Sequence, residues 1–166
     1  MNEYTILTTI EFCCNLLRGN SVLKEVNLMP DINMIVCCKQ VPDPEAPPSL
    51  FKVDTAANKM VTKAEVKPVI GQYDEFALEA ALRIKDSLGG KITTLSLGNN
   101  IVRDVIKKAP AVGSDELILL EDEAFEGGDS WSTAQALATA IKKIGQYDLI
   151  FCGRQSSDWD AGQVGL

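Results

Sequence analysis

The chain has 166 residues, of which 46% are hydrophobic and 23% are charged, as in a single globular domain with an apolar core. Its net charge of −7 argues against nucleic-acid binding, and the complete lack of histidine removes the commonest general base and zinc ligand. No apolar run has membrane-spanning length, and the five cysteines lack Cys-x-x-Cys spacing, which favours a reducing compartment.

Residues 1–31 differ from the rest of the sequence. Their start is not basic and Glu11 interrupts the apolar stretch, so they make a poor signal peptide. We expect a leader, not shared with the family discussed below, that is disordered or loosely packed. A short helix from Tyr4 to Leu17 is the alternative.

Regular patterns begin at Ile32. An apolar run over 32–38 predicts a first strand, and residues 39–44 with a later Pro-Pro pair predict an extended loop. Two short alternating segments, Lys52-Val53 and Met60-Val61-Thr62, predict a small hairpin.

Two helices and a strand are predicted next. Residues 73–88 carry apolar side chains at helical spacing and are followed by Gly89-Gly90, so we expect a helix against a core. Residues 91–97 predict a second strand. Residues 100–109 predict a second helix, ended by Pro110 and Gly113.

The last elements complete an alternation of strands and helices. Residues 116–120 and 147–152 predict the third and fourth strands. Between them, Asp129 or Ser130 caps a third helix whose core face is expected to carry Trp131, Ala134, Ala138 and Ile141, with the tryptophan as a core anchor. Strands that alternate with single helices predict the α/β class, with a doubly wound parallel sheet and right-handed crossovers.

The loop after the fourth strand, residues 153–165, is rich in glycine, hydroxyl and amide groups. Such a loop between a strand and a helix suits a nucleotide phosphate on backbone N–H groups, although Asp158 and Asp160 would repel phosphate. A surface loop of Asx-turns is the alternative. A calcium loop lacks its later ligands, and no metal site is expected. Ligands of parallel sheets bind beyond the carboxyl ends of the strands, which favours the nucleotide site.

Five segments follow one another in an informative order. They are Cys38-Lys39-Gln40-Val41-Pro42-Asp43, Gln72-Tyr73-Asp74-Glu75, Ser96-Leu97-Gly98, Asp129-Ser130-Trp131-Ser132-Thr133-Ala134, and Gly153-Arg154-Gln155 with Asp160-Ala161-Gly162-Gln163-Val164-Gly165. In this order they resemble electron transfer flavoprotein β subunits. The resemblance covers residues 32–166 and implies an adenine-nucleotide-binding, Rossmann-like domain.

The resemblance also implies a function. It implies an electron carrier without catalytic residues of its own, which binds AMP or, in its place, a second FAD. It implies a heterodimer with an α subunit that carries FAD, electron supply from flavin-dependent dehydrogenases, and a cytoplasmic location. Binding to nucleic acid and insertion into a membrane are not expected.

By position, the adenine-nucleotide contacts of the family fall on four segments of this chain: the end of the first strand, the start of the first helix, the second strand and the loop after the fourth strand. The residues are Cys37, Gly71, Gln72, Tyr73, Asp74, Leu97, Gly153, Arg154, Gln155, Ser156, Ser157, Asp158, Trp159, Asp160, Ala161, Gly162, Gln163 and Val164.

The chain departs from the family pattern in three places. Gly71-Gln72 replaces the usual Asn-Pro, so one side-chain amide contact to the nucleotide is not expected. Pro110 falls where the second helix of the family continues. Leu166 falls in the middle of the family's domain, so the domain is expected to be incomplete and further strands and partner-binding segments to lie beyond this sequence.

Two other classes of protein use similar sheets. A nucleotide sensor of the universal-stress type would carry a glycine-rich phosphate loop ending in Gly-Ser or Gly-Thr after the fourth strand. An ATP-cleaving, adenylating enzyme would carry Ser-Gly-Gly after the first strand. The sequence has neither motif at these positions.

Overall fold

The computed structural model of the chain describes residues 32–57 and 59–166. The expectations for residues 1–31, including the alternative helix from Tyr4 to Leu17, lie outside the described residues.

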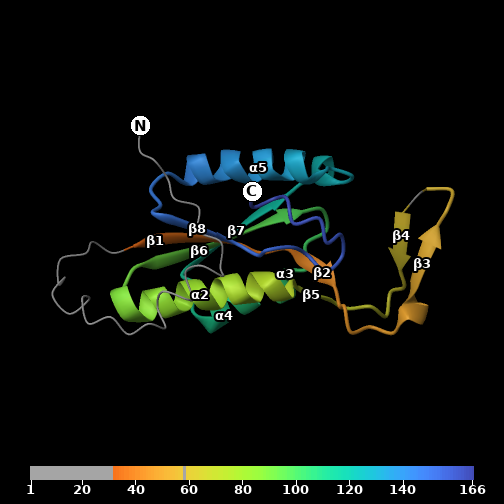
Figure 1. Ribbon diagram of the computed structural model, residues 1–166, viewed down its shortest axis with the longest axis horizontal. Coiled ribbons are helices and arrows are strands. Elements are labelled where there is room, and N and C mark those ends of the chain that lie inside the picture. Colours follow the sequence, from red (N-terminus) through yellow and green to blue (C-terminus); the bar gives the residue numbers. More distant parts are fainter. Residues whose placement is uncertain (1–31, 58) are drawn as a thin grey trace.

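Four strands form one parallel sheet (Figure 1). They are β1 (Asn33–Cys37), β6 (Lys91–Gly98), β7 (Glu116–Glu121) and β8 (Leu149–Cys152). Their order is β7-β6-β1-β8, so β1 pairs with β6 on one side and with β8 on the other. The predicted α/β class and parallel sheet are confirmed, and the fourth strand lies beside the first. Strand order therefore reverses between β1 and β8, which is where such sheets bind ligands.

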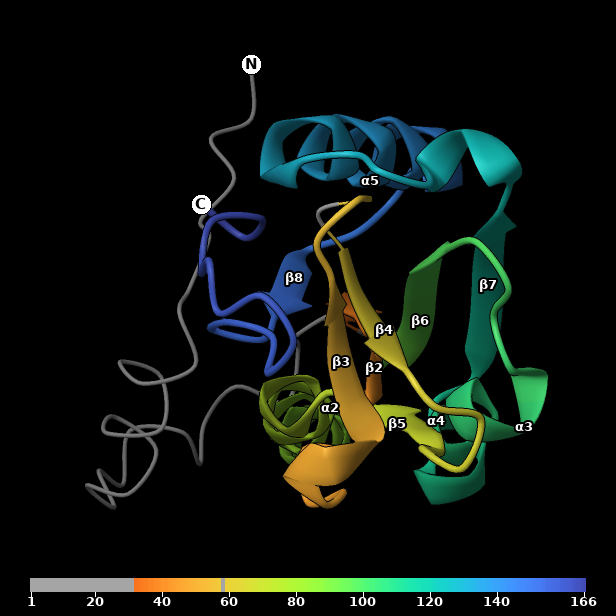
Figure 2. The same cartoon turned by 90° about the vertical axis from the view of Figure 1, so that its right-hand side faces the viewer.

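Helices cover both faces of this sheet (Figure 1, Figure 2). One face packs against α2 (Gln72–Leu88), with α3 (Arg103–Ile106) and α4 (Lys108–Val112) beside it. The other face packs against α5 (Ser130–Ile144). Successive side chains of a strand point to opposite faces, so β1 contributes Met34 and Val36 to the first core and Ile35 to the second.

The first predicted helix is confirmed as α2. Its apolar spacing buries Ala77, Ala81 and Ile84 against the sheet, and Gly89 follows its last residue with a φ of 80°. Leu88, the last apolar residue of the predicted helix, is exposed because it lies in the final turn.

The helix predicted over 100–109 is not continuous, because α3 and α4 meet at Lys107. The prediction that Pro110 ends this helix is wrong, since Pro110 is the third residue of α4. Proline has no amide hydrogen to donate to the carbonyl of Ile106, four residues earlier, and its ring clashes with that group, so the helix breaks between the two. Within the first turn of α4 the missing hydrogen is tolerated. Gly113 ends α4 as predicted.

The third predicted helix, α5, begins at its expected cap, since the Asp129 carboxylate accepts a hydrogen bond of 2.8 Å from the Ser132 amide. Its buried face matches the predicted one only in part. Trp131 is 73% exposed, so its role as a core anchor is wrong, and Ala138 is exposed as well. Ile141 of the predicted face is buried, as is Leu137, which the prediction left out. Larger aliphatic side chains bury more apolar area than alanines, and this sets the rotation of the helix.

Two small antiparallel pairs complete the structure. β2 (Gln40–Pro42) lies in the segment predicted as an extended loop, and it pairs with β5 (Pro68–Ile70), which was not predicted. The predicted hairpin is confirmed as β3 (Phe51–Asp54) and β4 (Lys59–Thr62), which project from the body (Figure 1) and follow the short helix η2 (Pro48–Leu50). A second short helix, η3 (Glu123–Phe125), follows β7. Among the described residues, no helix combines the length and the apolar character that crossing a membrane requires.

Candidate functional site

The loop over 153–165 lies at the switch point, as the sequence predicts. It leaves the carboxyl end of β8, directly beside the end of β1, because Cys37 pairs in register with Cys152. Figure 2 shows the loop at the β8 side of the sheet, between α5 and the start of α2.

Two predicted site residues come from the strands. Cys37 ends β1, and Leu97 lies near the end of β6, two positions beyond the Leu95 that pairs with Cys37. Both side chains pack with the core on the α5 face and are partly exposed. They therefore present an apolar, partly open surface at the carboxyl edge of the sheet.

The start of α2 meets the same edge from the other face. The amide of Gly71, which precedes the helix, donates to the Lys39 carbonyl at 2.9 Å and so ties the helix start to the end of β1. Among the described residues no side chain caps α2. Its first turn carries two acids, Asp74 and Glu75, whose negative charges are favourable at the positive end of the helix dipole.

Asp74, in the first turn of α2, joins these segments. Its side chain accepts a hydrogen bond of 2.7 Å from the Lys39 amide, and the backbone of Gly153 also hydrogen-bonds it. Asp74 is only 8% exposed. Burial raises its pKa from 3.8 to about 6, although the two backbone hydrogen bonds and the Lys39 charge lower it. A buried carboxylate therefore holds together the ends of β1, α2 and β8.

Gly153 is the position where this packing is tightest. A Cβ atom on Gly153 would lie 2.2 Å from Asp74 Oδ1 and 2.9 Å from both the Asp74 amide nitrogen and the Tyr73 carbonyl carbon. Only glycine allows such an approach of backbone to backbone.

The rest of the loop folds on itself. The Asp160 amide donates to the Ser156 carbonyl at 2.8 Å, and the Gln155 side-chain amide donates to the Asp160 carboxylate. Asp160 and Gly162 have φ values of 54° and 60°. Gly162 therefore takes the left-handed backbone conformation that glycine readily adopts, and the Asp160 carboxylate is satisfied by Gln155 within the loop.

The second loop acid, Asp158, is neutralised by Lys39. The Lys39 amine lies 2.7 Å and 2.9 Å from the two carboxylate oxygens and 3.5 Å from the Ser156 hydroxyl. The Asp158 side chain is 14% exposed and that of Lys39 43%. Repulsion of phosphate by Asp158, which the sequence suggests, is thus offset by a cation.

Replacing Lys39 by methionine is expected to loosen this loop. The change keeps most of the apolar stem and leaves Asp158 without its cation, which costs about 1 kcal/mol and increases loop opening about fivefold. Trypsin cleavage after the exposed Arg154, followed by mass spectrometry under native conditions, measures the opening.

Lys91→Met is the matched control, because Lys91 forms an ion pair of 2.6 Å with Glu116 at the opposite end of the sheet. It should leave cleavage after Arg154 at the wild-type rate. Equal rates in the Lys39 variant and the wild type would show that the ion pair does not hold the loop.

The structure brings the four predicted segments to one edge, but not every predicted side chain faces the others. Gln72 is exposed and lines a separate groove beside α3 and α4. The other exposed members are in the loop: Arg154, Ser157, Trp159, Asp160, Ala161, Gln163 and Val164. Their predicted nucleotide contacts stay predictions. Two residues at this edge are absent from the predicted site, Cys152 and Lys39, the second of which the sequence allows either as a phosphate or carboxylate partner or as a solvated side chain. The position of Lys39 directly after a strand was the available signal.

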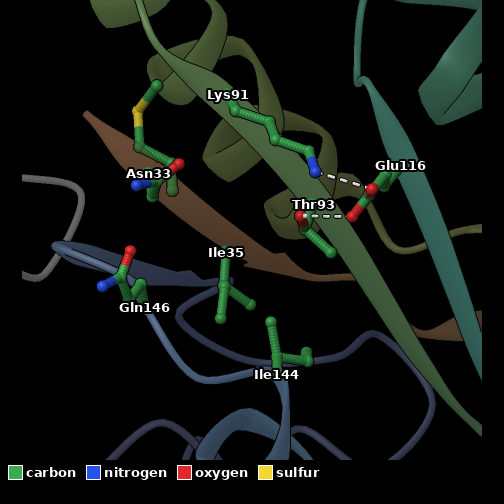
Figure 3. Close-up of a pocket in the computed structure, with 8 residues that line it drawn as sticks. Asn33, Ile35, Lys91, Thr93, Glu116, Ile144 and Gln146 are labelled. Carbon is green, nitrogen blue, oxygen red and sulfur yellow. Dashed lines mark hydrogen bonds and ion pairs between the residues drawn. The ribbon is translucent and has the colours of Figure 1, made fainter. Parts of the chain in front are cut away.

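A cavity of about 300 Å³ lies at the opposite, amino edge of the sheet (Figure 3). Ile35 and Ile144 form its apolar part, and Asn33 and Gln146 lie on one side. On the other side, Lys91 and Thr93 both contact Glu116, so the charges pair with each other (Figure 3). The cavity shares no residue with the predicted site, and we assign it no function.

Comparison with known proteins identifies the chain's relatives. Residues 58–166 match the family model described as "Electron transfer flavoprotein domain". The chain is 41% identical over 134 residues to the electron transfer flavoprotein subunit beta of Thermoanaerobacterium thermosaccharolyticum, a match that covers 81% of the chain and 49% of the relative. It is 43% identical over 135 residues to the protein FixA of Bradyrhizobium diazoefficiens, covering 79% of the chain and 45% of the relative.

A third relative is named as part of a larger assembly. The caffeyl-CoA reductase-Etf complex subunit CarD of Acetobacterium woodii is 38% identical over 135 residues, covering 81% of the chain and 50% of the relative. The chain thus spans about half the length of the curated relatives it matches.

Proposed function

Because the chain belongs to the electron transfer flavoprotein family, we propose that it serves as part of a β subunit that binds an adenine nucleotide at the β1–β8 switch point. The observation that supports this most directly is the convergence of four predicted segments at one sheet edge. The Lys39 and Gly153 hydrogen bonds to Asp74, together with the Lys39–Asp158 ion pair, connect three of these segments directly.

The residues at this edge fit an adenylate group. The loop over 153–165 offers its backbone N–H groups to a phosphate, and Asp158, whose charge would oppose it, is paired with Lys39. Cys37 and Leu97 offer an apolar surface for a base. In the proposed complex the loop closes over the nucleotide, and its exposed side chains become contacts. AMP and FAD share the adenylate, so both suit these features.

We further propose the assembly in which the chain acts. It pairs with an α subunit that carries FAD and receives electrons from flavin-dependent dehydrogenases in the cytoplasm. The bound flavin supplies the electron transfer, and this chain's residues hold the nucleotide and fix the ends of β1 and β8. The chain therefore carries electrons rather than catalysing a reaction of its own. The names of the relatives, which describe subunits of such proteins, support this assignment.

Titration of the purified chain tests the nucleotide site. Calorimetry with AMP, with FAD and with inorganic phosphate should give binding of the two nucleotides and much weaker binding of phosphate, because the base adds contact area. Failure of both nucleotides to bind the chain, alone and with its partner subunit, would contradict the proposal.

A pair of charge reversals locates the site. Arg154→Glu places a negative charge in the loop and is expected to weaken AMP binding about tenfold, or roughly 1.4 kcal/mol. Arg103→Glu is the matched control, since Arg103 is also exposed but lies on α3. Equal losses of AMP affinity in both variants would show a general effect of protein charge and would place the nucleotide elsewhere.

A further inference from the structure

Two free thiols face each other at the carboxyl edge of the sheet. Cys37 of β1 and Cys152 of β8 are in register on neighbouring parallel strands, and both are partly exposed. Cys37 packs toward the α5 face, and the alternation along β8 turns Cys152 to the same face, because Ile150, two residues earlier, packs there. Cys38 is buried in the other core and serves as an internal comparison.

The spacing of the strands suits a bond between these sulfurs. Neighbouring strands lie about 4.8 Å apart, and disulfides join Cα atoms that are roughly 4.4–6.8 Å apart. Parallel neighbours hold their Cβ atoms farther apart than the roughly 3.8 Å of a relaxed disulfide, so the bond would be strained. Strained, accessible disulfides are the ones that are readily reduced again.

The two thiols also differ in reactivity. A hydrogen bond from Cys37 lowers the pKa of Cys152, although burial opposes this. The same hydrogen bond and burial raise the pKa of Cys37, and the charge of Asp74 adds to this effect. The pair thus has one sulfur suited to ionise and one suited to remain a thiol. The other groups that act on it are Cys38 and Asp74.

We propose that Cys37 and Cys152 form a reversible disulfide when the chain meets hydrogen peroxide, which makes this pair a modification site. Cys152 releases its proton, and its thiolate attacks one peroxide oxygen, so that the O–O bond breaks and a sulfenic acid and hydroxide form. The hydroxide takes up the released proton and becomes water. The Cys37 sulfur then attacks the Cys152 sulfur, the S–O bond breaks, and the hydroxide leaves as water with the Cys37 proton. Two thiols are oxidised to one disulfide, and one peroxide is reduced to two waters.

The modification would act on the edge that carries the predicted site. Cys37 is itself one of the predicted contacts, and the loop returns to the pair at Gly165, where a Cβ atom would lie 3.0 Å from Cys152 Cβ. This consequence rests on the proposed function, whereas the disulfide does not. We expect bound AMP to shield the pair and to slow its oxidation at least severalfold.

Mass spectrometry of the peroxide-treated chain tests the disulfide. Cys13→Ser and Cys14→Ser leave only the three cysteines of interest, and free thiols are then alkylated before digestion. The expected product has a Cys152 peptide linked to the peptide that ends at Lys39, and dithiothreitol releases it. Cys37 and Cys38 share that peptide, so Cys38→Ser and Cys37→Ser on this background separate them.

The link should persist in Cys38→Ser and vanish in Cys37→Ser, with circular dichroism confirming that both variants are folded. A link that survives in Cys37→Ser, or alkylation of all thiols after peroxide treatment of the folded chain, would overturn the disulfide. A link that forms equally fast with and without AMP, in a chain that binds AMP, would uphold the disulfide and move the nucleotide away from Cys37.

Discussion

Replacing Gly153 by alanine is expected to destabilise the chain by about 3 kcal/mol or more, measured by urea unfolding followed by circular dichroism. The added Cβ atom would lie 2.2 Å from Asp74 Oδ1 and 2.9 Å from backbone atoms of Tyr73 and Asp74. A flexible side chain can turn away from such a contact, but the backbone of α2 cannot move without losing its packing on β1 and β8. The clash therefore separates the loop from α2 and breaks the Asp74 hydrogen bonds.

Gly98→Ala is the matched control. Gly98 ends β6 at the same sheet edge, but a Cβ atom there would lie 3.5 Å from the Ile101 side chain, an ordinary van der Waals distance. We expect its free energy of unfolding to stay within about 0.5 kcal/mol of the wild type. Similar losses of stability in Gly153→Ala and Gly98→Ala would refute the close approach of Gly153 to the start of α2.

The stability of the chain is expected to fall as the pH rises from about 4 to about 7, and Asp74→Asn should remove that slope. Burial raises the pKa of Asp74 from 3.8 to about 6 in the folded chain. In this range the folded chain binds more protons than the unfolded chain, so its extra stability is present below pH 4 and is lost as the pH rises through 6. This rise of about two pKa units corresponds to at most about 3 kcal/mol in the free energy of unfolding.

The other carboxyl groups with a shifted pKa among the described residues act at lower pH than Asp74. Interactions lower the pKa values of Asp115, Glu116 and Asp129, so the stability they contribute is present above about pH 4.5 and is lost as the pH falls further. Burial raises the pKa of the Cys38 thiol, so its ionisation affects the stability of the chain only at high pH. The chain has no histidine. The slope between pH 4 and 7 therefore belongs mainly to Asp74.

Urea titrations at several pH values measure this effect. The wild type and Asp86→Asn, an exposed position on the same helix, should lose stability in parallel between pH 4 and 7. Asp74→Asn should show a flat profile and lower stability at pH 4, where a protonated carboxyl fits the site better than an amide. A slope in Asp74→Asn equal to that of the wild type would exclude Asp74 as its source.

Regular elements of this fold could be predicted where one pattern dominates. The stripe of Ala77, Ala81 and Ile84 identifies α2, and short apolar runs identify the four strands. The face of α5 could not be found in this way, because Trp131 and Leu137 belong to different apolar stripes, and packing against the sheet decided between them. β2 and β5 have three residues each, which is too short for a periodic pattern, and Pro42 pairs with Pro68.

The candidate site could be located from the sequence, but its internal contacts could not. Alternation of strands and helices predicts where β1 and β8 end, and the glycines mark the loop between them. Nothing local shows that Asp74 is buried, because acids in the first turn of a helix are commonly solvated there. Its partners, Lys39 and Gly153, are supplied by two other segments and become neighbours only in the folded chain.

The strand order has a consequence for how the chain folds during synthesis. β1 is made first and lies in the interior of the sheet, yet its contact with the start of β8 joins residues that are 115 positions apart, as in the hydrogen bond from the Asn33 amide to Asp148. Pairings of such long range close large loops before any stabilising contact forms, which makes folding slow. While the ribosome is still making the later strands, Met34, Ile35 and Val36 lack one of their neighbours. That apolar segment is then a natural target for a chaperone.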